Sequence, residues 1–143
     1  MKQEYKDLLL KDLCNRIMYG VKCTVYENTS VHTLSGVLPN KVYSELYFEE
    51  LDWKEHDGFA DIQYCKPYLF PLSSMTKEQK KYISNRWGIN EEFDFEIDPN
   101  WGEYIVDSGD AVDFVDWLNE NHFDYHWLIE KGLAIDATDK NIY

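Results

Sequence analysis

The stretch Val-Lys-Cys-Thr-Val-Tyr at residues 21–26 carries the pattern that decides the fold. Val21, Cys23 and Val25 alternate with longer polar or aromatic side chains, and such alternation places every second residue on one face of a β-strand. Strand-like composition recurs downstream at residues 31–38, 42–51 and 59–65. Together these segments predict a small antiparallel sheet over residues 21–65.

An amphipathic helix is predicted directly before this sheet, over residues 4–18. Leu9, Leu13 and Ile17 recur at every fourth position and therefore lie on one helix face. Gly20 follows as a residue that commonly ends a helix. We expect the apolar face of this helix to cover the sheet.

Two prolines shape the segment that follows the sheet, Lys-Pro-Tyr-Leu-Phe-Pro-Leu-Ser-Ser at residues 66–74. Proline lacks a backbone N–H, so Pro67 and Pro71 argue against a central strand or a helix interior. We therefore interpret this segment as an extended crossover that its aromatic side chains hold against the core.

A second helix is predicted after this crossover. Thr76 and Gln79 have the spacing of a capping box, which indicates a helix over residues 77–86 that ends at Trp87–Gly88. The following residues, 89–108, alternate acidic and aromatic side chains and contain a turn sequence. They favour a short strand and a turn.

Two further helices are predicted near the end of the chain. Asp110 precedes an amphipathic run and is expected to cap a helix over residues 110–121. Asp124 is expected to cap a last short helix over residues 125–131, with Gly132 as the residue that ends it.

These elements predict a single α+β domain over residues 1–143. An N-terminal helix and two to three C-terminal helices cover a small antiparallel sheet. The acidic C-terminal third, residues 91–143, is expected to pack on the part that contains the sheet. The predicted core consists of apolar side chains from the helices and the first strand: Leu9, Leu13, Ile17, Val25, Phe114, Leu118 and Leu128.

The composition favours a folded cytoplasmic protein. The content of aromatic residues is 16%, too high for a disordered acidic chain, and no apolar run approaches the roughly 20 residues that span a bilayer. Three cysteines without a C-x-x-C pair indicate reduced thiols. Glu4 and Asp7 stand where a secretory leader carries basic residues. We expect a monomer or weak homodimer in the cytoplasm, without a membrane segment.

The net charge of −13 is concentrated in the last third of the chain. Residues 1–40 and 41–90 carry net charges of +1 and −1, whereas residues 91–143 carry −13. Such a segment repels nucleic acid, so direct binding of DNA or RNA is not expected. It attracts basic surfaces, which predicts a basic protein as the partner.

Acidic and aromatic residues of this third define a candidate interaction surface. Four acids gather on one side of the helix predicted over residues 110–121, and no Lys or Arg three or four positions away neutralises them. Tryptophans lie among the acids, and tryptophan is favoured at interface centres. The alternative is a structural or housekeeping domain whose acids form a solvated face. The predicted surface consists of Asp110, Asp113, Asp116, Glu120, Trp101 and Trp117.

The histidines are the candidates for enzyme chemistry, and they are weak ones. His122 and His126 are four positions apart, a spacing that binds zinc when both lie on one helix face. Because Asp124 between them is expected to cap a helix, the two side chains are not expected to share a face. A metal-dependent hydrolase that uses these histidines is the second alternative function.

No other motif predicts a cofactor or a catalytic residue. The chain contains 7 Gly and lacks the glycine-rich loops that hold phosphate groups. Residues 96–107 match a calcium-binding loop at its first, third and fifth positions but depart from it at the glycine and at the last ligand. We therefore expect no metal, no cofactor and no enzymatic activity.

Three segments carry a resemblance to known proteins. Residues 11–23 contain Asp-Leu-Cys-x-Arg, residues 66–79 contain Lys-Pro-Tyr-Leu-x-Pro-x-Ser-Ser-Met-Thr, and residues 113–136 contain Trp-Leu-Asn-x-x-His-Phe-Asp-Tyr. In these boxes the chain resembles small uncharacterised proteins of gut Bacteroidetes genomes and their phages or mobile elements. The resemblance implies a mobile-element setting and a non-catalytic accessory or host-interaction protein. The acidic charge predicts a basic host or element protein as its partner. Those proteins usually have Arg after the last box, where this chain has His126.

Overall fold

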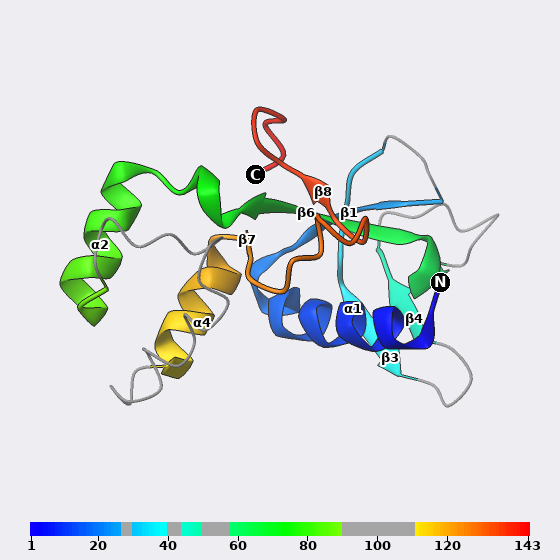
Figure 1. The fold of residues 1–143 in the computed structure, drawn as a ribbon. Helices are drawn as coiled ribbons and strands as arrows, with labels where there is room; N and C mark the ends of the chain where they lie inside the picture. Colours follow the sequence, from blue (N-terminus) through cyan, green and yellow to red (C-terminus); the bar gives the residue numbers. More distant parts are fainter. Residues whose placement is uncertain (27–29, 40–43, 50–57, 90–110) are drawn as a thin grey trace.

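The computed structural model describes residues 1–26, 30–39, 44–49, 58–89 and 111–143. Its elements make an α+β fold, which confirms the predicted class. Figure 1 shows α1 (Gln3–Arg16) running along a sheet that contains β1 (Lys22–Val25) and β6 (Cys65–Pro71). Beyond one end of this sheet, α2 (Lys77–Trp87) and α4 (Ala111–Glu120) lie side by side.

Helix α1 forms where the four-residue spacing predicted it. Leu9 and Leu13 are fully buried, and the partly buried Ile17 begins a short 3-10 turn, η1 (Ile17–Tyr19). Gly20 ends the turn with φ 67°, a left-handed conformation that glycine adopts without strain. The predicted end of the helix is therefore confirmed.

The strands form two sheets. In the first, the strand order is β2 (His32–Thr33), β1, β6 and β7 (Phe123–Asp124), and β8 (Ile135–Asp136) also pairs with β6. The second sheet is antiparallel and contains β3 (Gly36–Pro39), β4 (Ser44–Tyr47) and β5 (Phe59–Asp61). The buried face predicted for residues 21–26 is confirmed, since Val21, Cys23 and Val25 are all buried.

The segment predicted as one strand over residues 31–38 is divided between the two sheets. The N–H of Leu34 donates to the carbonyl of Val21 at 3.0 Å, next to the first sheet. The N–H of Ser35 donates to the carbonyl of Tyr47 at 2.9 Å, in the second sheet. Because consecutive backbone groups bond to different sheets, each strand ends after a few residues.

The interpretation of residues 66–74 as an extended crossover is wrong. This segment forms β6, which pairs antiparallel with β1 and parallel with both β7 and β8. Short 3-10 turns flank it, η2 (Ile62–Tyr64) before and η3 (Leu72–Ser74) after. β6 is therefore the strand that joins the N-terminal and C-terminal parts of the first sheet.

Both prolines fit into β6 because of the direction in which their nitrogens point. Consecutive residues of a strand turn their backbone groups to alternate edges. The N–H of Tyr26 donates to the carbonyl of Tyr64 at 3.0 Å, so the backbone groups of even-numbered residues in β6 point toward β1. The nitrogen of Pro67 points to the other edge and does not interrupt the hydrogen bonds between β1 and β6. The N–H of Phe70 donates to the carbonyl of His122, directly before β7. The nitrogen of Pro71 points to the opposite edge of β6.

The predicted start and end of α2 are confirmed. The N–H of Gln79 donates to Thr76 Oγ1 at 3.1 Å, and the N–H of Thr76 donates to Gln79 Oε1 at 2.9 Å. Gly88 ends the helix in the left-handed conformation. α4 lies within the predicted range, whereas Asp110, Trp101 and the strand, turn and calcium-loop patterns within residues 90–110 lie outside the described residues. None of the described helices is long and apolar enough to cross a membrane.

The last short helix, predicted over residues 125–131, does not form. Asp124 accepts backbone N–H groups as expected, but from Leu128 at 2.9 Å and Ile129 at 2.8 Å, which lie farther along the chain than a helix cap reaches. Trp127 has φ 58°, a left-handed conformation that interrupts a helix. The segment is a series of turns that leads into β8, a strand that the sequence analysis missed.

Two groups of buried apolar side chains make up the core. The larger one joins α1 to both sheets and to the turns after β7, and the smaller one lies between α2, α4 and β7. Among the predicted core residues, Ile17 is only partly buried and packs on the larger group. The others are buried as predicted: Leu9, Leu13, Val25, Phe114, Leu118 and Leu128.

Candidate functional site

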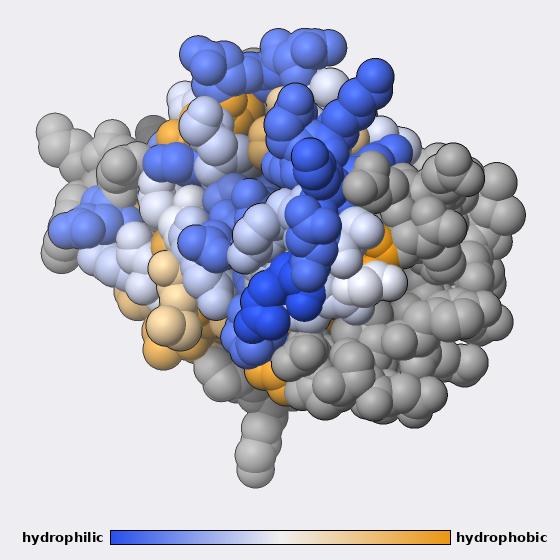
Figure 2. Space-filling model, turned by 90° about the vertical axis from the view of Figure 1, so that its left-hand side faces the viewer, coloured by the Kyte–Doolittle hydropathy of each residue, from blue (hydrophilic) through white to orange (hydrophobic). Residues whose placement is uncertain are grey.

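Three of the four predicted acids lie exposed on one face of α4. Asp113, Asp116 and Glu120 project from an arc of about 100° on this helix, and exposed Val112 falls in the same arc. We call these four residues the acidic face. The fourth predicted acid, Asp110, lies outside the described residues. Figure 2 views the molecule from the end where α2 and α4 lie, and within the coloured part of this view hydrophilic residues predominate.

The fold brings one base to the acidic face. A guanidinium nitrogen of Arg86, in the last turn of α2, lies 3.6 Å from Asp113 Oδ2, and both side chains are exposed. Spacing along α4 does not reveal this pair, because Arg86 comes from another helix. Within the described part of the chain, Asp116 and Glu120 form no ion pair.

The negative potential of these two acids extends to η1, the 3-10 turn that follows α1. Burial raises the pKa of Tyr19, and the negative charges of Asp116 and Glu120 raise it further. This hydroxyl therefore stays protonated beside the carboxylates. The acidic face thus borders on η1, where Met18 is largely exposed.

Trp117 packs inside an aromatic cluster next to the acidic face. Its ring centroid lies 5.8 Å from that of Tyr82, 6.4 Å from Phe114 and 5.7 Å from Phe123. The side chain is only partly exposed, so its main contacts hold α4 against α2 and β7. Trp101, the other predicted tryptophan, lies outside the described residues. The exposed apolar side chain on α4 is instead Val112, which is 71% exposed.

The two histidines contact different partners. His126 Nδ1 lies 2.9 Å from Asp12 Oδ1, whereas the ring of His122 stacks on Tyr143 with centroids 3.7 Å apart. Each imidazole is thus held by its own neighbour rather than beside the other. Among the described residues, no group of three or more His, Cys, Asp or Glu side chains is placed to hold a metal ion.

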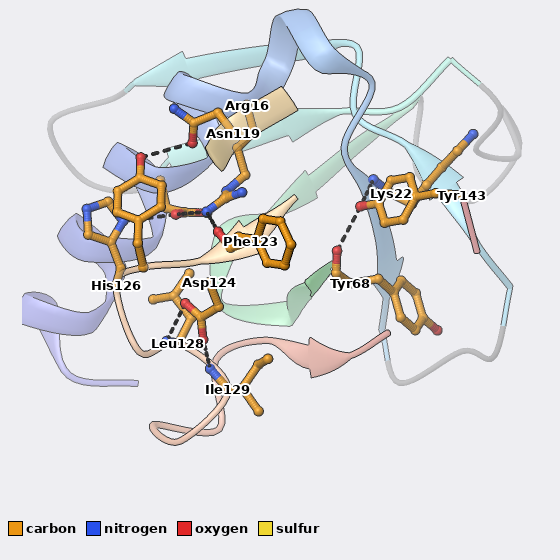
Figure 3. A network of polar contacts seen from close by, with 12 residues as sticks. Arg16, Lys22, Tyr68, Asn119, Phe123, Asp124, His126, Leu128, Ile129 and Tyr143 are labelled. Atoms are coloured by element: carbon orange, nitrogen blue, oxygen red, sulfur yellow. Dashed lines mark hydrogen bonds and ion pairs between the residues drawn. The ribbon is translucent and has the colours of Figure 1, made fainter. Parts of the chain in front are cut away.

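A buried ion pair anchors the C-terminal part of the chain to α1 (Figure 3). Arg16 donates from Nε to Asp12 Oδ2 at 2.7 Å and from a terminal nitrogen to Oδ1 at 3.0 Å. The same terminal nitrogen donates to the carbonyl of Phe123 at 2.7 Å. Both charged side chains are fully buried. The i, i+4 spacing of Asp12 and Arg16 on the apolar side of α1 was a readable signal that the sequence analysis did not use.

Aromatic and amide groups complete this polar network. The guanidinium carbon of Arg16 lies 5.2 Å from the ring centroid of Tyr125, whose hydroxyl donates to Asn119 Oδ1 at 2.9 Å. Burial alone raises the pKa of Asp12, but Arg16 and the contacts with His126 together hold it below its ordinary value of 3.8. Asp12 is therefore ionised at neutral pH and balances the charge of Arg16.

Comparison of this chain with known protein families, with curated proteins and with solved structures finds no match.

Proposed function

We propose that this chain is a non-enzymatic accessory protein of a phage or mobile element, which presents the acidic face of α4 to a basic protein partner. The observation that carries the proposal is the pair of exposed acids, Asp116 and Glu120, that form no ion pair with the described residues. A basic surface would supply the missing opposite charges.

Helix electrostatics support a partner over a merely solvated face. Asp116 and Glu120 are separated by one helical turn, where like charges repel by a few tenths of a kcal/mol. Glu120 also ends α4, whose last turn contains no basic residue, and a negative charge is unfavourable at a helix C-terminus. This arrangement lowers the stability of α4 in the free protein, and a basic partner would offset the loss.

Charge and exposed apolar surface fit a protein partner. Residues 91–110, which precede α4, add eight acidic and no basic residues to the sequence. These negative charges accelerate the encounter with a basic protein and repel the phosphates of nucleic acid. Val112 supplies an apolar contact within the acidic face. No comparable observation favours a metal-dependent hydrolase, because His122 and His126 contact different partners.

Capture from a Bacteroidetes cell lysate, with variants of equal net charge, tests the proposal. The face variant carries Asp113→Asn, Asp116→Asn and Glu120→Gln. The control variant carries Glu4→Gln, Glu130→Gln and Asp139→Asn, which neutralise exposed acids elsewhere. We expect wild type and control to retain the same basic protein at low salt and to release it as salt screens the charges. The face variant should not retain it.

Equal retention by the face variant and the control would mean that the acidic face is only solvated. Equal loss from both variants would show that net charge, rather than this face, attracts the retained proteins.

A further inference from the structure

A cavity of about 450 Å³ lies between α2, α4 and the end of β6. Side chains at the N-terminus of α2, at the C-terminal end of α4 and in β6 and β7 line it, together with Tyr143. Its volume falls within the range of small-molecule sites in proteins. The cavity differs from the acidic face, with which it shares only Glu120.

Aromatic rings form the apolar part of this cavity. The centroid of Phe70 lies 5.9 Å from that of Tyr143 and 6.4 Å from that of Phe123, both at tilted angles. The imidazole of His122 stacks on the ring of Tyr143. Such rings pack well against a flat apolar body, and their faces also attract cations.

Two polar side chains around these rings, Ser74 and Asn121, offer hydrogen-bond acceptors. Ser74 uses its hydroxyl proton to donate to the carbonyl of Pro71 at 2.7 Å, which leaves its oxygen lone pairs available. Asn121 donates from Nδ2 to the carbonyl of Trp117 at 2.9 Å, which leaves its Oδ1 available. Glu120 adds a carboxylate, and none of the described lining residues is Lys or Arg. The charge of the described lining thus favours a positively charged ligand, whose N–H groups can donate to Ser74 and Asn121.

His122 does not repel a positively charged ligand in this cavity. It is 7% exposed, and burial together with the charges of Arg16 and Lys22 lowers its pKa to about 4. The imidazole is therefore neutral near pH 7. Its Nδ1 is buried without a hydrogen-bond partner among the described residues, and its backbone φ is 59°.

The helix ends reinforce this preference. The C-terminal carbonyls of α4 make its end partly negative beside Glu120 and Asn121. At the N-terminus of α2, the reciprocal hydrogen bonds of Thr76 and Gln79 already occupy part of the donors that would otherwise attract an anion.

We propose that this cavity binds a small aromatic amine or amidine, with its ring against Phe70, Phe123 and Tyr143 and its cationic group at Glu120. The acceptors of Ser74 and Asn121 receive the remaining N–H groups of the ligand. This proposal does not depend on a basic protein partner of the acidic face.

Titration calorimetry of the full chain with three probes of one shape tests the charge preference. Benzamidine is cationic, benzamide is neutral and benzoate is anionic. We expect benzamidine to bind and benzamide to bind at least about threefold more weakly, because an ion pair with a partly exposed carboxylate contributes about this factor to affinity. Benzoate should show no measurable binding, because its charge is repelled by Glu120. In NMR spectra, benzamidine should shift the ring signals of His122 and Tyr143.

Two variants of α4 locate the cationic group. Glu120→Gln should weaken benzamidine binding about threefold to tenfold. Asp116→Asn, which removes an exposed acid that does not line the cavity, should leave binding within about twofold. No binding at millimolar concentration, equal affinity for the three probes, or equal effects of both variants would overturn the proposal. Since Asp116 belongs only to the acidic face, loss of a protein partner in Asp116→Asn with normal benzamidine binding would separate the two proposals.

Discussion

The hydroxyl of Tyr143 donates a hydrogen bond to the backbone carbonyl of Tyr68 at 2.7 Å and accepts one from the N–H of Lys22 at 3.0 Å. β1 and β6 pair with Thr24 opposite Lys66, so Lys22 and Tyr68 would be the next hydrogen-bonded pair of this ladder. A side-chain hydroxyl thus bridges two strands where a direct backbone bond would otherwise form. Burial raises the pKa of this hydroxyl far above its ordinary value, so it remains protonated.

Removal of this hydroxyl should destabilise the sheet. Tyr143→Phe keeps the ring stacked on His122 but leaves the N–H of Lys22 and the carbonyl of Tyr68 without this partner. We expect a loss of about 1–3 kcal/mol in the free energy of unfolding, measured by urea denaturation. Tyr64→Phe, at an exposed tyrosine, is the matched control and should change it by less than about 0.5 kcal/mol. Similar effects of both changes would contradict the bridging role.

The free energy of unfolding should decrease as the pH is lowered below 6.5, because of His122. Its pKa is about 4 in the folded chain, below the ordinary value of 6.5, so the unfolded chain binds more protons between these values. The contribution is complete above pH 6.5 and decreases as pH falls toward about 4, by up to about 3 kcal/mol. His122→Asn, which tolerates the positive φ, should flatten this part of a plot of unfolding free energy against pH. An unchanged slope would be evidence against a buried neutral His122.

The buried ion pair should tolerate joint replacement better than the loss of one partner. Asp12→Leu alone leaves the charge of Arg16 buried without its counter-ion, and we expect a loss of about 3–5 kcal/mol in unfolding free energy. Asp12→Leu combined with Arg16→Met removes both charges and should cost much less. A double-mutant cycle measured by urea denaturation checks this. Additive effects would show that the two charges are independent.

Neutralising the acidic face should stabilise the free protein. Asp116→Asn with Glu120→Gln removes like-charge repulsion and a negative charge at the end of α4. We expect a gain of about 0.3–1 kcal/mol in unfolding free energy, largest at low salt. Thermal denaturation at two salt concentrations measures it. A loss of stability would show that these carboxylates make stabilising contacts within the folded chain.

Local patterns were sufficient for α1, α2 and α4, though not for the segment after Asp124. The four-residue spacing of Leu9 and Leu13, the capping box at Thr76 and the amphipathic run after Asp110 each act within one or two helical turns. The location of the net charge is likewise a property of the sequence alone. These features are enough to predict the fold class and the row of acids on α4.

Contacts between distant residues decided the remainder. β6 is a central strand in spite of its prolines because β7 and β8 arrive from far along the chain. Arg86 reaches Asp113 from another helix, and Tyr143 bridges to Lys22 across 121 positions. The turns after Asp124 replaced a helix because Leu128 packs into the core while its N–H bonds to that carboxylate. A local pattern records which face a residue prefers, whereas the partner on that face is set by packing of the whole chain.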